Sequence, residues 1–343
     1  MSEISVIVVT YNQEATIART IDSILSQRMK DATFEIVIGD DCSTDGTSDI
    51  CREYKRRYPN IIRYYHRERN LGLVYNYFQC IRDARGEFIA DCAGDDFWVD
   101  ERKLDKEYNL IRSDSEITLV HTGWMECDED GGNCRLTEIS NENLYVDSIA
   151  EKTTLTTALL RHEKAAMIHL CTAMYRREAI MKWMESFPEL FDSRRYRCED
   201  FQIITLLSSS GKIGYIPDVT LHYIVKKDSL SHKSDFGEKF LQVEADIRLT
   251  EHIREVLNLN EEDVIDSYDT RLEYLCSQAI YSGEAILRKK YFDLLMFLPD
   301  GVKRSLRRMV KEKVLRSRTL SFLYRLIMGK RESDHRNPSN PSQ

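Results

Sequence analysis

The sequence predicts an α/β fold in which a parallel sheet carries helices on both faces. Two observations lead to this prediction and to the place of the site. Short apolar segments rich in β-branched residues alternate with segments of helical spacing, and the alternation runs β-α-β-α-β-α-β through residues 4–98. Polar residues follow each predicted strand. Because ligands bind at the carboxyl ends of the strands in such sheets, these polar residues mark the expected site.

Four segments have the character of buried strands. The first, ISVIVVTYN at 4–12, is an apolar run that ends in a turn signal. The second runs from Phe34 to Ile38 and is followed by the carboxylate-rich turn GDDCSTDGT. The third lies within IIRYYHRERNLG at 61–72, and the fourth lies within GEFIADCAGDDFW at 86–98.

Helices are expected between these strands. In EATIARTIDSILSQ, residues 14–27, apolar residues recur at i, i+4, i+7 and i+8: Ile17, Ile21, Ile24 and Leu25. The segments TSDICREYKRRY at 47–58 and GLVYNYFQCIRDAR at 72–85 are the next two helices. This order is typical of a parallel sheet covered on both faces.

Composition narrows the class of protein. The chain has 343 residues and 42% hydrophobic content, enough for one large or two modest folded domains. Its net charge of −8 argues against a nucleic-acid partner. The chain starts without the basic segment of a signal peptide and has no apolar run long enough to span a membrane, which predicts a cytoplasmic protein.

The nine cysteines are scattered, without a C-x-x-C pair. Cys127 and Cys134 are the only close pair in a segment of loop character. This usage predicts a reducing compartment and small buried residues, in preference to a disulfide framework or a metal site.

Two adjacent carboxylates, Asp95 and Asp96, follow the fourth strand. The two negative charges repel each other, and the pair is costly to bury unless a positive charge lies beside it. A solvated turn is one explanation. The other is a hard divalent cation, Mg²⁺ or Mn²⁺, held by carboxylate oxygens and shared with the phosphates of a substrate.

The polar residues that follow the strands are expected to form one rim. They are Thr10, Tyr11, Asn12, Asp40, Asp41, Asn70, Gly72, Asp95 and Asp96. Helix capping accounts for one member of the Asp40–Asp41 pair but not for both. Neither a P-loop nor a G-x-G-x-x-G turn is present, so a bound nucleotide diphosphate would need a metal ion to neutralise it.

These motifs together resemble the family-2 glycosyltransferases of the GT-A fold, a Rossmann-like fold with a mostly parallel central sheet. The resemblance is carried by SVIVVTYNQEATIARTIDSILSQ, EIVIGDDCSTDGT and RNLGLVYNYFQCIRDARGEFIADCAGDDFW, in this order across about residues 3–125. It continues to about residue 232 in RCEDFQIITLLSSSGKIGYIPDVTLHYIVKKDSLS. The bacterial members that build surface polysaccharides are the nearest type.

The resemblance implies a role for each motif residue. Asp41 matches the acid that binds the nucleobase. Asp95 and Asp96 match the ribose–diphosphate and metal motif, with Asp96 the expected direct ligand. Because many members carry D-x-D and this chain carries adjacent acids, the choice between them stays open. In CEDF, Asp200 matches the catalytic base of inverting members, and Glu199 is the fallback.

For three further groups of residues, the sequence leaves two explanations open. Lys226 and Lys227 replace the family's usual basic residue or histidine, and they contact the diphosphate or face solvent. Trp98 lies beside the sugar or acceptor, or packs in the core. His222 and His232 are late histidines of the kind that ligate metal in some GT-A enzymes, or they are structural.

The implied reaction is a single displacement with inversion. The metal ion and lysines stabilise the leaving nucleotide diphosphate, and Asp200 takes the proton from an acceptor hydroxyl. The expected donor is a UDP-sugar, and the expected acceptor is a glycan or a lipid-linked glycan. A non-catalytic sugar-nucleotide binding module is the alternative, and it has no need of an acid at position 200.

The predicted domains are a catalytic domain at 1–235, with a nucleotide half at about 1–125 and an acceptor half at about 126–235. A helical region at 236–331 and a disordered tail at 332–343 follow. Residues 301–331 hold eleven Lys and Arg and one acid, and the segment 301–328 combines a basic face with an apolar face. This predicts docking on the anionic inner membrane surface, with an ordinary packed helix as the alternative.

Overall fold

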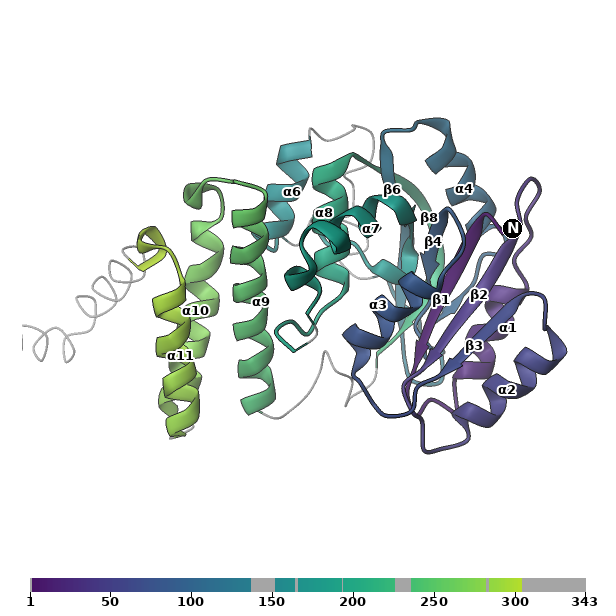
Figure 1. The fold of residues 1–343 in the computed structure, drawn as a ribbon, viewed down its shortest axis with the longest axis horizontal. Coiled ribbons are helices and arrows are strands. Elements are labelled where there is room, and N and C mark those ends of the chain that lie inside the picture. Colours follow the sequence, from purple (N-terminus) through teal and green to yellow (C-terminus); the bar gives the residue numbers. More distant parts are fainter. Residues whose placement is uncertain are drawn as a thin grey trace, which may run out of the picture. The chain divides into compact units, whose positions relative to one another are not determined.

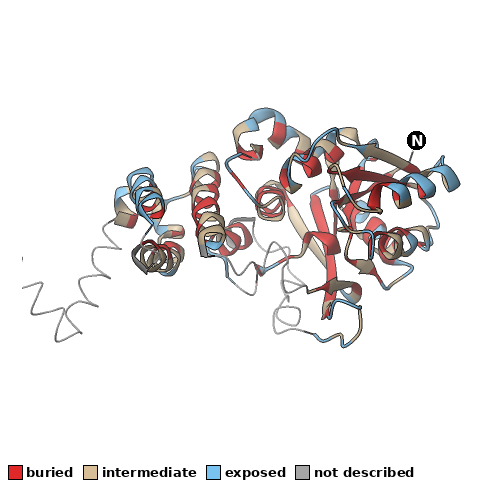
Figure 2. Cartoon of the chain, turned by 90° about the horizontal axis from the view of Figure 1, so that it is seen from below, coloured by how far each residue is buried: buried red, intermediate tan, exposed pale blue. Residues whose placement is uncertain are grey.

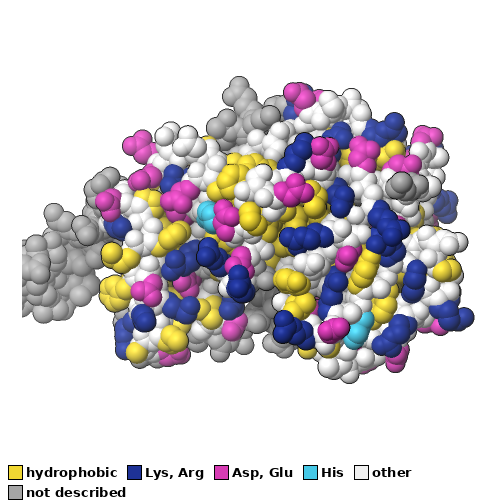
Figure 3. Space-filling model, in the orientation of Figure 1, with side chains coloured by type: hydrophobic (Ala, Val, Ile, Leu, Met, Phe, Trp, Pro, Cys, Tyr) yellow, Lys and Arg dark blue, Asp and Glu magenta, His cyan; other side chains and the backbone are white. Residues whose placement is uncertain are grey.

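The computed structural model describes residues 2–136, 152–163, 166–192, 194–225, 236–281 and 284–303. The chain falls into two compact units, Met1–Leu259 and Asn260–Gln343. No described helix is both long enough and apolar enough to cross a bilayer. On the face seen in Figure 3, basic and acidic side chains are interspersed.

The first unit is built on an eight-stranded sheet with the order β3-β2-β1-β4-β7-β6-β8-β5 (Figure 1). Its strands are β1 (Ile4–Thr10), β2 (Phe34–Asp40), β3 (Ile62–His66), β4 (Phe88–Asp91), β5 (Phe97–Trp98), β6 (Ile117–Cys127), β7 (Ala173–Arg176) and β8 (Lys212–Ile224).

The helices of this unit connect or follow the strands. They are α1 (Ile17–Leu25), α2 (Thr47–Arg57), α3 (Leu73–Asp83), α4 (Lys103–Ser113), α6 (Lys152–Leu160), α7 (Arg177–Ser186), α8 (Asp200–Ser210) and α9 (Phe236–Val256). Short 3₁₀ turns lie at Leu170–Thr172 and Pro188–Phe191.

The first four strands are parallel, as the sequence predicts. β1 pairs with β2 and β4, and β2 pairs with β3, all in parallel. Thr10 lies opposite Asp40 in this register, so the polar residues after β1 and β2 leave the sheet at the same edge. β7 is antiparallel to both β4 and β6, and β5 is antiparallel to β8, which makes the sheet mostly but not wholly parallel.

Helices cover both faces of this sheet, which confirms the predicted layers. On one face Ile17, Ile21 and Ile24 of α1 are fully buried in a core cluster with alternate residues of β1. Each such side chain contributes about 1.5–3 kcal/mol by leaving water. On the other face α3 lies against β2, where a Cβ at Gly39 would collide with the Cys80 sulfur. Figure 2 shows the strands as the buried centre between more exposed helices.

The second unit consists of helices in the part of it that the structure describes. α10 (Ile265–Tyr281) and α11 (Ala285–Phe297) follow a short 3₁₀ turn, Glu261–Asp263. α11 buries Leu287, Tyr291 and Leu294. These helices agree with the helical character predicted after residue 235, although α9 groups with the first unit. The basic segment is described only at 301–303, and the tail at 332–343 lies outside the described residues.

The prediction that the cysteines are unpaired is wrong for one pair. Cys127 and Cys134 form a disulfide across a sequence separation of 7. The turn between them returns the chain along β6, which no spacing in the sequence indicates. The predicted small buried cysteines are confirmed at Cys51, Cys80, Cys92 and Cys171.

Candidate active site

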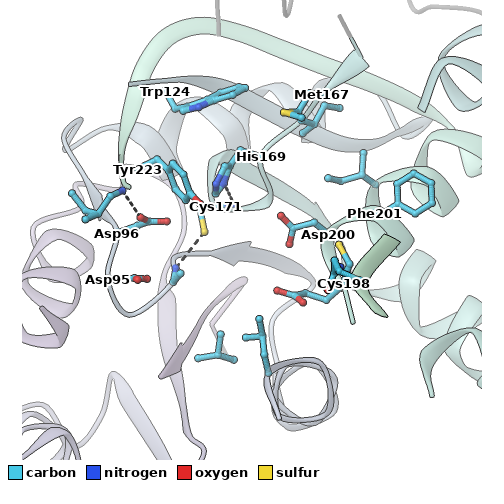
Figure 4. Close-up of a pocket in the computed structure, with 18 of the residues that line it drawn as sticks. Asp95, Asp96, Trp124, Met167, His169, Cys171, Cys198, Asp200, Phe201 and Tyr223 are labelled. Carbon is cyan, nitrogen blue, oxygen red and sulfur yellow. Dashed lines mark hydrogen bonds between the residues drawn. The ribbon is translucent and has the colours of Figure 1, made fainter. Parts of the chain in front are cut away.

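A cavity of about 1010 Å³ lies at the carboxyl ends of the parallel strands (Figure 4). It brings together residues that lie far apart in the sequence. Ten of the predicted site residues line it: Thr10, Tyr11, Asn12, Asn70, Gly72, Asp41, Asp95, Asp96, Glu199 and Asp200. Residues 159, 162, 163 and 166–169, together with residues of β6, β8 and α9, line much of the remaining wall.

The turn after β1 forms the first part of the wall. Thr10 donates to the Gln13 side chain at 2.7 Å. Asn12 has a φ of 52°, in the left-handed region that asparagine tolerates, and its side-chain oxygen accepts from the Thr44 backbone at 2.8 Å. These bonds fix the turn and leave the Tyr11 ring 46% exposed at the cavity.

Asp41 holds the loop that follows β3. Its two carboxylate oxygens accept backbone N–H groups from Leu71 and Gly72, each at 2.8 Å. Gly72 has φ 87° and ψ 152°, a conformation that is essentially restricted to glycine. Each Asp41 oxygen keeps a second lone pair, so the carboxylate can still accept a donor from a nucleobase.

Asp40 lies outside the cavity wall. It is fully buried and accepts bonds from the Ser43 backbone, the Ser48 hydroxyl and the Tyr64 hydroxyl at 2.9, 2.5 and 2.7 Å. Burial alone would raise the pKa of Asp40, but these donors outweigh it and lower the pKa to about 2. The carboxylate therefore fixes the turn from β2 to α2, and the capping explanation accounts for it.

Asp95 and Asp96 lie at the cavity on the turn after β4 (Figure 4). The Ile224 backbone donates to Asp96 Oδ1 at 2.9 Å, and the Thr20 hydroxyl donates to the Asp96 carbonyl at 2.6 Å. A Cβ at Gly94 would collide with the Gln13 side chain, so glycine lets this turn lie against the turn after β1. Two carboxylates on one cavity wall are a donor set that suits Mg²⁺ or Mn²⁺.

Glu199 and Asp200 lie on the opposite side of the cavity, at the start of α8. Burial raises the pKa of Asp200 to about 6, although a bond from the Leu170 backbone works against the rise. Burial and the neighbouring Asp200 raise the pKa of Glu199 as well. A carboxyl that titrates near neutral pH suits a general base.

An aromatic wall between the two carboxylate groups was not predicted. The His169 ring centroid lies 4.5 Å from that of Tyr223 and 6.0 Å from that of Trp124 (Figure 4). Burial lowers the pKa of His169 to about 4, although the Asp95 charge opposes the shift, so the imidazole is neutral at pH 7. Its Nδ1 accepts from the Cys171 backbone at 3.3 Å. Isolated aromatic residues in strands and loops carry no spacing signal from which this wall could be found.

Other predicted residues lie elsewhere. Trp98 is 4% exposed, donates to the Cys171 carbonyl at 3.2 Å and has the Lys103 ammonium 4.6 Å from its ring centroid. Trp98 does not line the cavity, which agrees with the alternative that its side chain packs in the core. His222 also lies off the wall, with Nδ1 3.3 Å from the Cys134 sulfur.

The remaining three predicted residues fall outside the described part of the chain. They are Lys226, Lys227 and His232.

Comparison with known families gives a match over more than half of the chain. The model of the family described as Glycosyl transferase family 2 matches residues 5–184.

Curated proteins are also similar to part of this chain. An uncharacterised protein of Mycobacterium tuberculosis (strain ATCC 25618 / H37Rv) is 37% identical over 127 residues, covering 37% of this chain and 36% of that protein. The poly(ribitol-phosphate) beta-glucosyltransferase of Bacillus spizizenii (strain ATCC 23059 / NRRL B-14472 / W23) is 33% identical over 118 residues, covering 34% of this chain and 18% of that protein. The match thus spans about a third of these relatives or less.

Two solved structures share the fold. S. aureus TarS 1-349 in complex with UDP has a TM-score of 0.59 at 16% identity, covering 89% of this chain and 83% of that chain. The mannosyltransferase PcManGT from Pyrobaculum calidifontis, in complex with GDP-Man and Mn²⁺, has a TM-score of 0.51 at 17% identity, covering 90% and 84%. These likenesses confirm the predicted GT-A fold.

Proposed function

The chain belongs to glycosyltransferase family 2, and from this premise we propose that it is an inverting, metal-dependent enzyme. It transfers a sugar from a nucleotide-diphosphate donor to a hydroxyl group of a surface-polymer acceptor. One observation carries the proposal: a single cavity holds the Asp95–Asp96 pair on one side and the Asp200 carboxyl on the other. A donor and an acceptor bound between them would meet within reach of both groups.

The donor is a nucleotide sugar, for which we propose UDP as the nucleotide. Asp41 would accept the imide N–H of uracil, and Tyr11 offers an exposed ring beside the base. TarS has been solved with UDP and with UDP-GlcNAc, which supports this nucleotide. Lys226 and Lys227 remain proposed contacts of the diphosphate.

Asp95 and Asp96 would hold Mg²⁺ or Mn²⁺, which supplies positive charge to the leaving diphosphate when bound. The Ile224 backbone holds the Asp96 carboxylate in place at the cavity, and Asp96 is the proposed direct ligand. The complex of PcManGT with Mn²⁺ supports this choice of metal.

Asp200 is the proposed general base. It would accept the proton of the acceptor hydroxyl while that oxygen attacks the anomeric carbon from the face opposite the diphosphate. Its raised pKa, about 6, leaves it ionised at pH 7 yet basic enough to take a proton. Trp124, Tyr223 and His169 offer aromatic faces to the C–H groups of the sugars.

The acceptor is proposed to be a glycan or a lipid-linked glycan at the inner membrane surface. The predicted docking segment, 301–328, is described only at 301–303. Within the second unit α11 exposes Ile286, Phe292, Met296 and Phe297 on its surface. The basic residues Arg288 and Lys289 are exposed on the same helix. Apolar and basic side chains together are typical of a helix that binds an anionic bilayer, which supports a peripheral location.

Assays of UDP release and product configuration test this function. Wild-type protein that is given a UDP-sugar and a surface-glycan acceptor should release UDP when Mn²⁺ is present. This release should stop when EDTA removes the metal. Asp96→Asn should be inactive with its fold intact. Proton NMR should show a β-linked product from an α-linked donor. Turnover that is unchanged in EDTA, or a product of retained configuration, contradicts the proposal. If the protein binds the donor but transfers the sugar to no acceptor, the result favours the alternative function, a non-catalytic sugar-nucleotide binding module.

A further inference from the structure

Three potential metal ligands meet on the first unit, apart from the cavity. The sulfurs of Cys127 and Cys134 and a ring nitrogen of His222 all lie within 4.8 Å of one another. Cys127 is 2% exposed, and the other two side chains are half-buried. None of the three lines the cavity that holds Asp95 and Asp96.

The backbone directs these side chains toward one another. Glu126 and Arg135 exchange two backbone hydrogen bonds, at 3.0 and 2.8 Å. The next pair inward, Cys127 and Cys134, is therefore directly opposed, with the Cα atoms 4.1 Å apart. β6 and β8 pair so that Met125 lies opposite His222, which places His222 on the same face of the sheet as Cys127.

The turn between the cysteines is held by bonds that do not involve sulfur. The Asp128 N–H donates to the Gly132 carbonyl at 3.1 Å, and the Gly131 N–H donates to the Asp128 carbonyl at 2.8 Å. The Asn133 side chain donates to the Asp128 carboxylate at 2.7 Å. Cleavage of the S–S bond would therefore leave both sulfurs beside the imidazole.

We propose that Cys127, Cys134 and His222 form a zinc site when the cysteines are reduced, and that the disulfide is the form of the same site without metal. Two thiolates and an imidazole are the ligands that zinc prefers, and the fourth tetrahedral position is left to water. Zn–S bonds of about 2.3 Å place the two sulfurs about 3.8 Å apart, a separation that the reduced pair reaches by side-chain rotation.

The exchange between the two forms consumes an external reductant. Two thiol molecules reduce the S–S bond to two cysteine thiols and become a disulfide themselves; a phosphine does the same with one water molecule, which supplies the two protons and the oxygen of the phosphine oxide. Zn²⁺ then binds both sulfurs and the imidazole, and the two thiol protons pass to solvent.

The surroundings favour this chemistry. The Nδ1 atom of His222 lies 3.3 Å from the Cys134 sulfur, so the imidazole supplies a nitrogen ligand directly beside the two sulfurs. The two sites also differ in the metal that they prefer. Soft sulfur ligands favour zinc, whereas the carboxylate oxygens of Asp95 and Asp96 suit Mg²⁺ or Mn²⁺.

The proposed zinc site adjoins the segment that carries the carboxylate pair. Phe97, the residue after Asp96, packs edge-on against His222 with ring centroids 5.2 Å apart. Arg19 lies over the same Phe97 ring at 4.3 Å and donates to the Asp130 carbonyl at 3.1 Å. The turn between the cysteines therefore supports the outer side of the Asp95–Asp96 turn.

Titration of the full chain with zinc and cobalt tests the proposal. Protein reduced with a phosphine and freed of metal should bind one Zn²⁺ per chain, and Co²⁺ in its place should give thiolate-to-cobalt charge-transfer absorption. Cys134→Ser should lose this absorption. His222→Gln should bind more weakly by on the order of tenfold or more, since loss of even a second-shell partner costs that much.

Matched variants separate this site from other ligands. Cys42→Ser and Cys276→Ser remove other partly exposed cysteines and should leave the absorption unchanged. Asp95→Asn removes a carboxylate of the cavity and should also leave it unchanged. The untreated disulfide form should give no absorption. If reduced wild type gives none, or if a correctly folded Cys134→Ser gives as much as wild type, the site does not exist.

Discussion

At the scale of single residues, hydrogen-bond donors decide what a buried carboxyl group can do. Asp40 and Asp200 have the same side chain, yet the pKa of Asp40 falls to about 2 and the pKa of Asp200 rises to about 6. Three side-chain and backbone donors surround the first, whereas burial dominates at the second. The first carboxylate is therefore a structural anchor, and the second suits proton transfer.

Asp200→Asn is expected to lower the rate of transfer by about a hundredfold or more, the usual scale for a general base, while the affinity for the nucleotide stays unchanged. The amide preserves the shape but cannot take the proton. Single-turnover rates and nucleotide Kd values measure the two effects. Glu199→Gln is the matched control and should cost less. Equal losses in both variants would move the role of the base away from Asp200.

The pH dependence of transfer should show the titration of the same group. Because the base acts in its ionised form, the rate should rise with pH and level off above an acid limb near 6, the pKa of Asp200. The raised pKa also means that the folded chain binds this proton more tightly than the unfolded chain does, so its ionisation lowers stability as the pH rises from about 4 to 6. A pH–rate profile without an acid limb would contradict the assignment.

At the scale of elements, the sequence predicts the parallel half of the sheet because apolar runs and helical spacing alternate there. The strands β1 to β4 and helices α1 to α3 agree with the predicted segments. The antiparallel strands β5 and β7 were not predicted, since β5 has two residues and β7 has four, too few to show alternation. Their pairing depends on contacts that are distant in sequence.

The residues of the site also divide into those that a local motif predicts and those that only the folded chain brings together. Asp41, Asp95, Asp96 and Asp200 stand in motifs that can be recognised locally. His169 and Tyr223 come together only when β8 lies beside the loop before β7, and no local pattern contains that information. Trp98 was assigned two roles because an aromatic residue beside a motif packs equally well in a core, which is where it lies.

Gly72→Ala tests how the loop after β3 is held. Its φ of 87° and ψ of 152° cost a residue with a side chain about 1–3 kcal/mol, although no atom lies within 4 Å of the new Cβ. The free energy of unfolding should fall by that amount, and nucleotide affinity should fall with it. Gly72→Asn should be just as destabilised, because this conformation lies outside the left-handed region that asparagine tolerates. Rescue by asparagine would contradict the assigned conformation.

At the scale of the whole molecule, we expect the first unit to carry out the chemistry and the second unit to determine where the enzyme works. The first unit contains the complete cavity, and the second unit exposes apolar and basic side chains on α11. We expect the second unit, whose range includes residues 301–328, to bring the enzyme to its acceptor at a bilayer.

The full chain should therefore sediment with vesicles that contain phosphatidylglycerol at low salt, and sediment less as salt rises, because each basic residue contributes about 1 kcal/mol near an anionic surface. A chain that ends at Pro299 keeps α11 and loses the basic segment, so it should sediment less. Failure of the full chain to sediment rejects the docking. Equal sedimentation of the shorter chain rejects the role of 301–328.

The central claim is that Asp95 and Asp96 bind a divalent cation that holds a nucleotide diphosphate in the cavity. Calorimetric titration of UDP into wild type and Asp96→Asn, with Mn²⁺ and with EDTA, tests it most directly. Wild type should bind UDP more tightly with Mn²⁺ than in EDTA, and Asp96→Asn should bind weakly and equally in both. Affinity that is the same with and without Mn²⁺ in wild type, or a Mn²⁺ effect that persists in Asp96→Asn, would contradict the account.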